Sequence, residues 1–233
     1  MPKLEDLHIN CTNFSPNVQP IVFVPFALKK YAFHYRGWVN GRQSSISSGW
    51  SLPLVSSRIS ICELELTITV AEDLVELLSS QQLCSVNKTG ALFFPQLRTV
   101  KLSILQDFSI FAPLLAQCPR VQTLHLISDI AQMPQLPQFI AIVDALPTAD
   151  CLRHLAFGLS TREEYYTFVE VTPNQSLRID KELQLQLRRL SGIQRLKSFT
   201  VLADPENSHA IRLPQVRDEC RERRIAFRIS PTL

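Results

Sequence analysis

A short pattern of apolar and polar positions recurs along the chain. It consists of an apolar residue, two further positions, a second apolar residue, one position and a third apolar residue. The clearest copies are Leu97-x-x-Val100-x-Leu102 and Val121-x-x-Leu124-x-Leu126. Other copies begin at Leu4, Leu28, Ile61, Leu152 and Leu196, and a degenerate last copy is Ile225-x-Phe227-x-Ile229. The end of each copy alternates with a period of two, which predicts about eight short strands that are buried on one face.

Segments with helical spacing follow several copies of the pattern. Apolar residues three and four positions apart predict helices over 70–83, 108–115, 137–146 and 180–192, and a last helix that opens at Pro214. Gly192 stands where it would end the fourth of these helices. Because short strand and helix units alternate, we predict a parallel sheet whose connections are right-handed crossovers.

Stacked units of this kind predict a curved sheet. One unit cannot bury both its strand face and its helix stripe, whereas stacking buries both in one continuous core. Strands stack about 4.8 Å apart and packed helices need about 8–10 Å, so the strands lie inside the bend. We therefore predict an α/β fold, an irregular leucine-rich-repeat solenoid over 1–233 with strands on the concave side and helices on the convex side. Successive copies start 24 to 44 residues apart, and the shortest spacings fall in the range of about 20–29 that leucine-rich repeats show.

Three stretches interrupt the repeat. The longest, 36–57, is rich in Gly and Ser and contains Trp38 and Trp50. We expect a loop there, whose tryptophans either pack against the solenoid or contact a partner. The second stretch, 159–178, predicts an extended hairpin with a strand at TFVEVT, and the third, 203–213, predicts an exposed turn.

The residues around the strand entries resemble a known family. FAPLLAQCPRVQTLHLIS at 111–128 resembles the helix-to-strand junction of F-box leucine-rich-repeat proteins, in which Cys-Pro follows an apolar helix and precedes L-x-x-L-x-L. FPQLRTVKLSI, MPKLEDLHINC and, more loosely, DCLRHLAFGLS are similar to the same entry. The irregular spacing is similar to that of fungal members. The resemblance implies a protein-protein interaction module, namely the substrate-recognition part of an F-box ubiquitin-ligase receptor.

Two features depart from the pattern of that family. No F-box is visible in the chain, so a Skp-type adaptor is an expected partner only if an F-box exists upstream. Met1 lies three residues before the first copy, where a solenoid normally has a capping unit. These features indicate a piece of a longer receptor or, alternatively, a truncated structural repeat fragment without a ligand of its own.

The candidate protein-binding residues lie between the buried positions of the predicted strands, where side chains face the concave side. They are His8, Asn10, His34, Glu63, Glu65, Lys101, His125 and His154, joined by Trp38 and Trp50 from the loop. Four of the five His in the chain occupy this face. They indicate either a ligand or pH-sensitive contact, or an ordinary solvated polar surface.

Composition and charge narrow the classes of function. A chain of 233 residues that is 45% hydrophobic and 19% charged has enough apolar surface for a sizeable core. Its net charge of +3 is too small to indicate a nucleic-acid or membrane partner. The six Cys have no metal-ligand spacing, and neither a signal peptide nor an apolar run of about 18 residues is visible. We therefore expect free thiols in an intracellular protein, cytoplasmic or nuclear.

The sequence contains no motif that indicates catalysis. A phosphate-cradling Gly loop, a G-x-S-x-G elbow and an H-E-x-x-H helix are all missing from it. We therefore expect no catalytic residues, no cofactor, no metal and no enzymatic activity. An α/β enzyme of unrecognised type is the alternative, because a sequence does not show whether a Cys or Ser lies beside a distant His.

Overall fold

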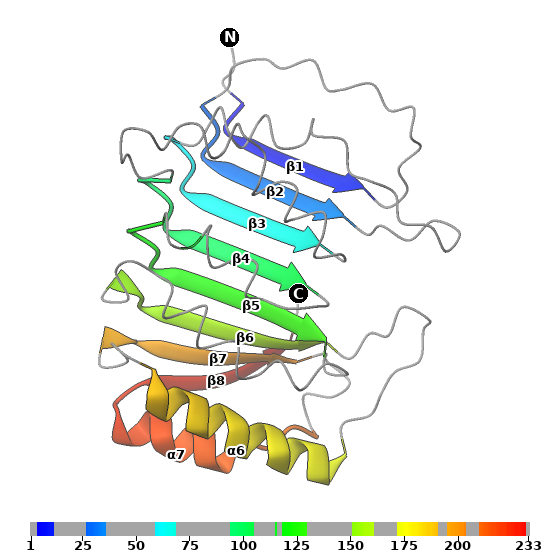
Figure 1. Cartoon of the computed structure of the whole chain (residues 1–233), viewed down its shortest axis with the longest axis vertical. Helices are drawn as coiled ribbons and strands as arrows, with labels where there is room; N and C mark the ends of the chain where they lie inside the picture. The colour runs from blue at the N-terminus through cyan, green and yellow to red at the C-terminus, as the bar shows by residue number, and fades with distance from the viewer. Residues whose placement is uncertain are drawn as a thin grey trace.

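The computed structural model describes residues 4–11, 27–35, 59–68, 94–104, 115, 118–129, 151–160, 172–190, 195–203 and 210–231. Within these ranges, eight strands form one parallel sheet in which each strand pairs with the next one in the sequence (Figure 1). The strands are β1 (Asp6–Cys11), β2 (Lys30–Tyr35), β3 (Glu63–Ile68), β4 (Thr99–Ile104), β5 (Thr123–Asp129), β6 (His154–Ser160), β7 (Ser198–Ala203) and β8 (Ala226–Pro231). Helix α6 (Pro173–Arg189) connects β6 to β7, and α7 (Pro214–Glu222) connects β7 to β8.

Equivalent positions of the recurring pattern lie side by side in the sheet. Leu64 of β3 pairs with Val100 of β4, and Val100 pairs with Leu124 of β5. The same register continues to Phe199 of β7 and Phe227 of β8. The predicted α/β fold with a parallel sheet and about eight strands is therefore confirmed.

A ladder of backbone hydrogen bonds joins the residues that precede the strands. The residue after the first apolar position of one copy accepts two N–H groups from the next copy. Thus Cys62 N–H donates to the Lys29 carbonyl at 2.8 Å and Arg98 N–H donates to the Cys62 carbonyl at 2.9 Å. The same bond joins Gln122 to Arg98 and Arg153 to Gln122, each at 2.8 Å. This ladder holds successive strand entries in one line, so the pattern repeats in its backbone contacts as well as in its residue types.

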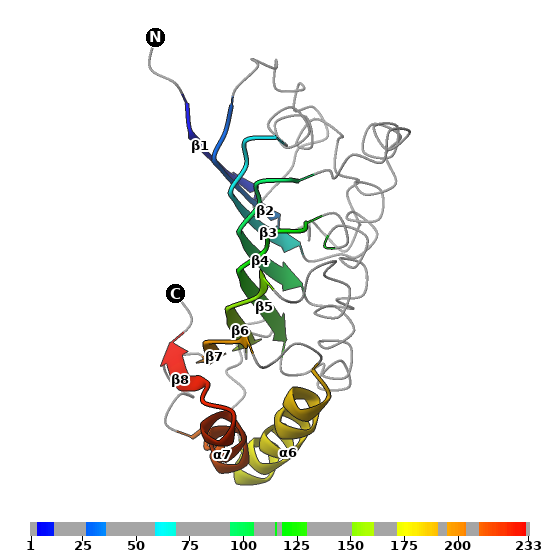
Figure 2. The ribbon, with the colours of Figure 1, turned by 90° about the vertical axis from the view of Figure 1, so that its left-hand side faces the viewer.

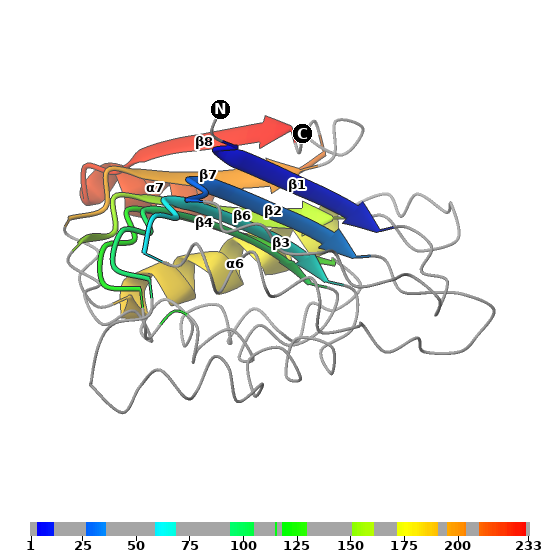
Figure 3. The same cartoon turned by 90° about the horizontal axis from the view of Figure 1, so that it is seen from above.

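The core lies on one side of the sheet. Alternate strand residues, such as Leu66, Leu102 and Leu126, are fully buried in one apolar cluster that also contains Ile179 and Leu183 of α6. Seen edge-on, the sheet is curved, and α6 lies on its convex side (Figure 2). Seen from above, the strands all point the same way and α6 runs back against them (Figure 3). This is the geometry that crossover connections between parallel strands require.

Both helices have ends whose backbone groups are satisfied by side chains. Thr172 caps α6 in a capping box with Gln175, and Pro173 follows the cap. The N-cap of α7, Leu213, provides no side-chain hydrogen bond. Instead the buried Asp180 of α6 accepts from the N–H groups of Gln215 at 3.0 Å and Val216 at 2.9 Å. Helix α6 therefore holds the N-terminus of α7.

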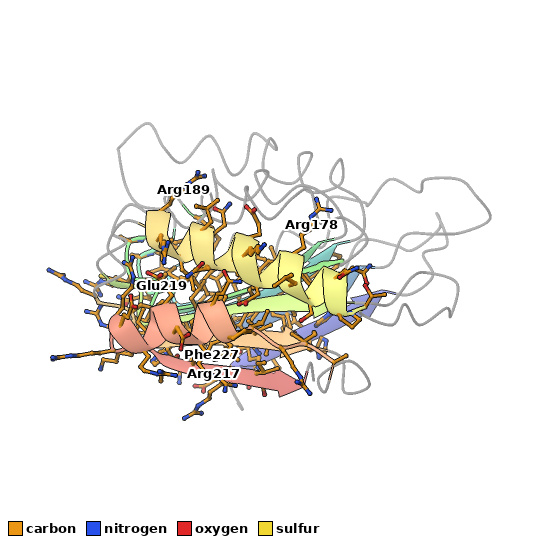
Figure 4. The ribbon with its side chains drawn as sticks, turned by 90° about the horizontal axis from the view of Figure 1, so that it is seen from below. Arg178, Arg189, Arg217, Glu219 and Phe227 are labelled. Atoms are coloured by element: carbon orange, nitrogen blue, oxygen red, sulfur yellow. The ribbon has the colours of Figure 1, made fainter. Side chains whose placement is uncertain are left out.

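A buried carboxylate joins the other end of the two helices. Arg188 of α6 and Arg223 each donate to Glu219 of α7 at 2.7 Å. Burial by itself raises the pKa of Glu219, but the hydrogen bonds from Arg188 and Arg223 outweigh burial and hold the pKa below its ordinary value. Figure 4 shows Glu219 between the two helices.

The structure describes only the ends of two predicted interruptions of the repeat. In 159–178, β6 continues to Ser160 and α6 begins at Pro173, whereas 161–171, with most of the predicted hairpin strand, lies outside the described residues. Thr172, the last residue of the predicted strand, instead caps the helix, because its side chain competes well for helical N–H groups. The end of 203–213 is not an exposed turn: Ile211 and Leu213 are buried in the core ahead of α7. These two apolar side chains enter the core although the composition of the stretch is that of a loop.

Of the predicted helices, the structure tests two. The segments at 180–192 and from Pro214 are helical, although the first begins at Pro173 and ends at Arg189. Gly192 and the predicted helices over 70–83 and 137–146 lie outside the described residues. In 108–115 the description covers Leu115 alone, which is helical.

Candidate functional site on the concave face

The concave face of the sheet consists of the side chains opposite the core. They come from three rows in which each residue pairs with its neighbour on the next strand. The first row begins with Asp6, Lys30, Glu63, Thr99, Thr123 and His154. The second begins with His8, Ala32, Glu65, Lys101, His125 and Ala156, and the third with Asn10, His34, Thr67, Ser103, Ile127 and Gly158. We call this surface the concave face.

Charged residues of β2, β3 and β4 form one connected network on the concave face. Lys101 Nζ lies 3.3 Å from Glu65 Oε2 and 3.6 Å from Glu63 Oε1. Lys30 Nζ lies 3.1 Å from the same oxygen of Glu63, and this hydrogen bond raises the pKa of Lys30. His34 extends the network, because its Nε2 lies 3.5 Å from Glu65 Oε1. A network of several half-buried charges is better ordered than isolated surface pairs.

The four histidines of the concave face fall into two groups. The rings of His8 and His34 lie with their centroids 4.6 Å apart on β1 and β2. His125 and His154 lie on β5 and β6, and His154 Nδ1 is 2.8 Å from the hydroxyl oxygen of Ser198. The sequence predicted that these side chains share a face, and the register confirms it. Their division between two regions was not apparent from the sequence.

The environment of His125 favours its neutral form. Burial, followed by the nearby charge of Lys101, lowers the pKa of His125 below 6.5. The unfolded chain therefore takes up this proton at a higher pH than the folded chain does. As a result, protonation favours unfolding once the pH falls below about 6.5.

We expect the free energy of unfolding to decrease as the pH is lowered through about 6.5 toward the lower pKa of His125 in the folded chain, in part because of this residue. The variant His125→Gln should remove that part, so its stability should depend less steeply on pH than that of the original protein. Urea unfolding at a series of pH values measures the difference. Thr123→Ala, on the same face of β5, is the control and should keep the original slope. An unchanged slope in His125→Gln would contradict the prediction.

An apolar area continues the third row toward β7. Ile127 of β5 lies beside Gly158 of β6, which pairs with Leu202 of β7. A Cβ atom at Gly158 would lie 2.8 Å from Cγ1 and 3.1 Å from Cβ of Ile127. Glycine is therefore needed at this position so that Ile127 can pack against the backbone of β6. This contact was missed in the sequence, where Gly158 is just one residue of a strand pattern.

The variant Gly158→Ala is expected to lower the free energy of unfolding by about 1–2 kcal/mol, because the added methyl group overlaps Ile127. Chemical denaturation measures the change. The double variant Gly158→Ala with Ile127→Ala removes both Cγ atoms that lie near the new methyl group, so it should be less destabilised than the sum of its two single changes. If the double variant is less stable by the sum of its two single changes, the close approach is not the cause.

The structure brings together half of the ten candidate residues: Glu63, Glu65, Lys101 and His34 are in contact through the network, and His8 lies against His34. His125 and His154 lie on the same face, on β5 and β6. Asn10 takes its predicted register position opposite His34, but its side chain lies outside the description, as do Trp38 and Trp50 entirely. Two further positions of the face, Ala32 and Ala156, are only 3% and 4% exposed. They pair with larger residues on both sides, which cover them, so they offer no contact surface.

The described residues provide little for metal or covalent chemistry. Within these ranges, no group of three or more His, Cys, Asp or Glu side chains could hold a metal ion. Burial raises the pKa of both Cys118 and Cys220 to about 12, so both thiols stay protonated near neutral pH. Such thiols pack as small apolar groups. The concave face instead presents an array of charges, imidazoles and hydroxyl groups.

The search for similar proteins adds no assignment to this site. No protein-family model, no curated protein and no solved structure matches the chain. In the part of the chain that the structure describes, no helix has both the length and the apolar character needed to cross a membrane.

Proposed function

We propose that this chain is an irregular leucine-rich-repeat domain that binds another protein on its concave face. The observation that carries the proposal is that polar side chains form rows across eight parallel strands, which lie in the sheet in the order of the sequence. The backbone ladder between successive strand entries supports a repeat, because every unit makes the same contact with the next. A curved sheet that presents side chains from many units is a surface suited to a large partner.

The charges of the concave face support a partner with a mixed-charge surface. Lys30, Glu63, Glu65 and Lys101 alternate in sign within a short distance. A partner with complementary charges would gain specificity and a faster association rate from this pattern. The apolar contact of Ile127 with Gly158 lies beside the network and would supply a desolvated area next to it.

We further propose that the bound protein is a substrate for degradation and that the chain is the recognition part of an F-box receptor. The resemblance of 111–128 and of the other strand entries to F-box leucine-rich-repeat proteins supports this assignment. The four described cysteines that are free thiols, Cys62, Cys118, Cys151 and Cys220, support an intracellular location. The free thiols of the described residues are therefore what a protein in a reducing, intracellular compartment would have.

A charge exchange tests binding on the concave face. In the double variant Glu65→Lys with Lys101→Glu, the two residues can still form an ion pair, but the pattern of charge seen by a partner is reversed. We expect proteins captured specifically by the full chain to be lost. The exchange also brings a carboxylate near Glu63, so the free energy of unfolding should fall by about 1 kcal/mol or less, as is usual for exposed ion pairs. Arg98→Glu, at an exposed strand entry, is the control and should keep them. Equal capture by all three proteins would contradict the proposal.

The ligase assignment has its own test. The full-length gene product, purified from its native cell, should recover a Skp-type adaptor and a cullin together with the partner of the concave face. If the partner is recovered and the adaptor is not, the binding function stands and the ligase assignment fails.

A further inference from the structure

The C-terminal end of the sheet is much more basic than the remainder of the chain. Twelve of the 24 Lys and Arg residues lie in 172–233, against seven of the 21 Asp and Glu residues. Two of those acids, Asp180 and Glu219, are buried and face inward, where they bind the backbone of α7 and the side chains of Arg188 and Arg223. Two of the seven acids are therefore inside, which adds to the excess of positive charge on the surface.

Helix α6 carries this positive charge on its outward side. Its exposed residues are Pro173, Asn174, Leu177, Arg178, Lys181, Leu185, Arg188 and Arg189, and none of them is acidic. Within the described residues, no ion pair neutralises Arg178, Lys181 or Arg189. Figure 4 shows Arg178 and Arg189 projecting from α6 on the side away from α7. This arrangement leaves a cationic helix surface open.

Two leucines lie among these cations. Leu177 is 48% exposed and Leu185 is 41% exposed, although both are large apolar side chains. They are eight residues apart on one helix, or roughly 12 Å along its axis. Lys181 lies midway between them in the sequence, so the outward side of α6 combines two apolar contacts with a central positive charge. We call this surface, formed by Leu177, Arg178, Lys181, Leu185 and Arg189, the α6 face.

We propose that the α6 face binds an acidic amphipathic helix of a protein partner, at a site separate from the concave face. Carboxylates of such a helix would pair with Arg178, Lys181 and Arg189. Its apolar residues, spaced seven or eight apart, would cover Leu177 and Leu185. Charge complementarity with apolar contacts at helical spacing argues for this occupant.

Two features favour a protein helix over a nucleic acid. A phosphate backbone would neutralise the cations but would leave both leucines exposed to water. Helix α6 has no aromatic residue on which a base could stack. An acidic amphipathic helix satisfies the cations and the leucines together.

A defined peptide tests this proposal with the full chain. The probe is a fluorescent model helix of Glu, Ala and Leu in which the leucines form one stripe, and its binding is followed by fluorescence anisotropy. A peptide of the same composition with the leucines distributed around the helix is compared with it. We expect the striped peptide to bind at least about tenfold more tightly than the other, and binding to weaken as salt is raised.

Substitutions locate the binding site. The variants Lys181→Glu and Leu185→Ser should each weaken binding of the striped peptide by about tenfold. The controls Arg98→Glu and Ile59→Ser change an exposed cation and an exposed apolar residue elsewhere and should bind as the original does. Because all four side chains are exposed, the variants should keep the original unfolding midpoint. Arg178→Gln provides a milder second change on the α6 face and should weaken binding in the same direction.

The possible results separate this proposal from its competitors and from the concave-face proposal. Failure of the striped peptide to bind, or binding that only the control variants weaken, would overturn it. The proposal would also be overturned if a DNA oligonucleotide or anionic phosphatidylserine vesicles bind tightly and the striped peptide does not bind. That result would favour those ligands. The exchange of Glu65 and Lys101 should leave peptide binding unchanged, so either proposal can fail while the other stands.

Discussion

Replacing Phe199 by Ala is expected to lower the free energy of unfolding by about 3–5 kcal/mol, the largest effect of any change considered for this protein. Phe199 is fully buried in the core on β7. Its ring stacks on that of Phe227 with centroids 6.3 Å apart, and its backbone pairs with Leu155 on the other side. Removing the ring therefore loses buried apolar area and leaves a cavity between neighbouring units.

Urea unfolding followed by circular dichroism measures this loss. Leu185→Ala is the matched control, because it also removes a large apolar side chain but from an exposed position on α6. Its effect should be below about 0.5 kcal/mol. Each unit of a repeat contacts mainly its neighbours, so hydrogen exchange in Phe199→Ala should increase most in β6, β7 and β8. Equal effects of the two substitutions would show that the core is not where the structure places it.

Replacing Asp180 by Ala is expected to lower the free energy of unfolding by about 2–3 kcal/mol. The two carboxylate oxygens of Asp180 accept the N–H groups of Gln215 and Val216. Pro214 has no N–H group, and Leu213 gives no cap, so these bonds satisfy the first donors of α7. Without Asp180, two backbone donors in a partly buried place lose their partner, and the favourable interaction of a negative charge with the helix N-terminus is also lost.

Two further variants test whether the lost hydrogen bonds to α7 cause the destabilisation. Thr172→Ala removes an exposed cap from α6 and should lower the free energy of unfolding by only about 1 kcal/mol. Asp180→Asn keeps one acceptor oxygen and should fall between the two. Chemical denaturation ranks the three. If Asp180→Ala is no more destabilising than Thr172→Ala, then Asp180 does not hold α7 as the structure indicates.

Local patterns predicted the strands well, because each strand is specified by a few residues close in the sequence. Alternation at Val100 and Leu102, or at Leu124 and Leu126, requires that these side chains share one buried face. The same alternation placed Glu65, Lys101 and His34 on the opposite face, and the register brings them into one network. Helix boundaries were predicted less well, since Thr172 and Pro173 begin α6 before its apolar stripe does.

The local pattern of apolar and polar positions could not predict contacts between distant segments. Asp180 and Glu219 look like ordinary surface acids of amphipathic helices, and the partners that join them to the other helix lie 31 to 36 residues away. Gly158 has the appearance of any strand residue until Ile127 of the neighbouring strand is seen beside it. The buried Ile211 and Leu213 belong to a stretch whose composition is that of a loop. In each case the deciding atom comes from another part of the chain.

The sequence by itself determined the recurring unit, the parallel order of the strands and the set of polar residues that share the concave face. These depend on the period of apolar positions, which is a local property. Tertiary structure alone decided which of those residues interact, which acids are buried between α6 and α7, and which leucines of α6 remain exposed among cations. Those outcomes depend on packing between segments far apart in the chain. The local pattern of apolar and polar positions does not specify that packing.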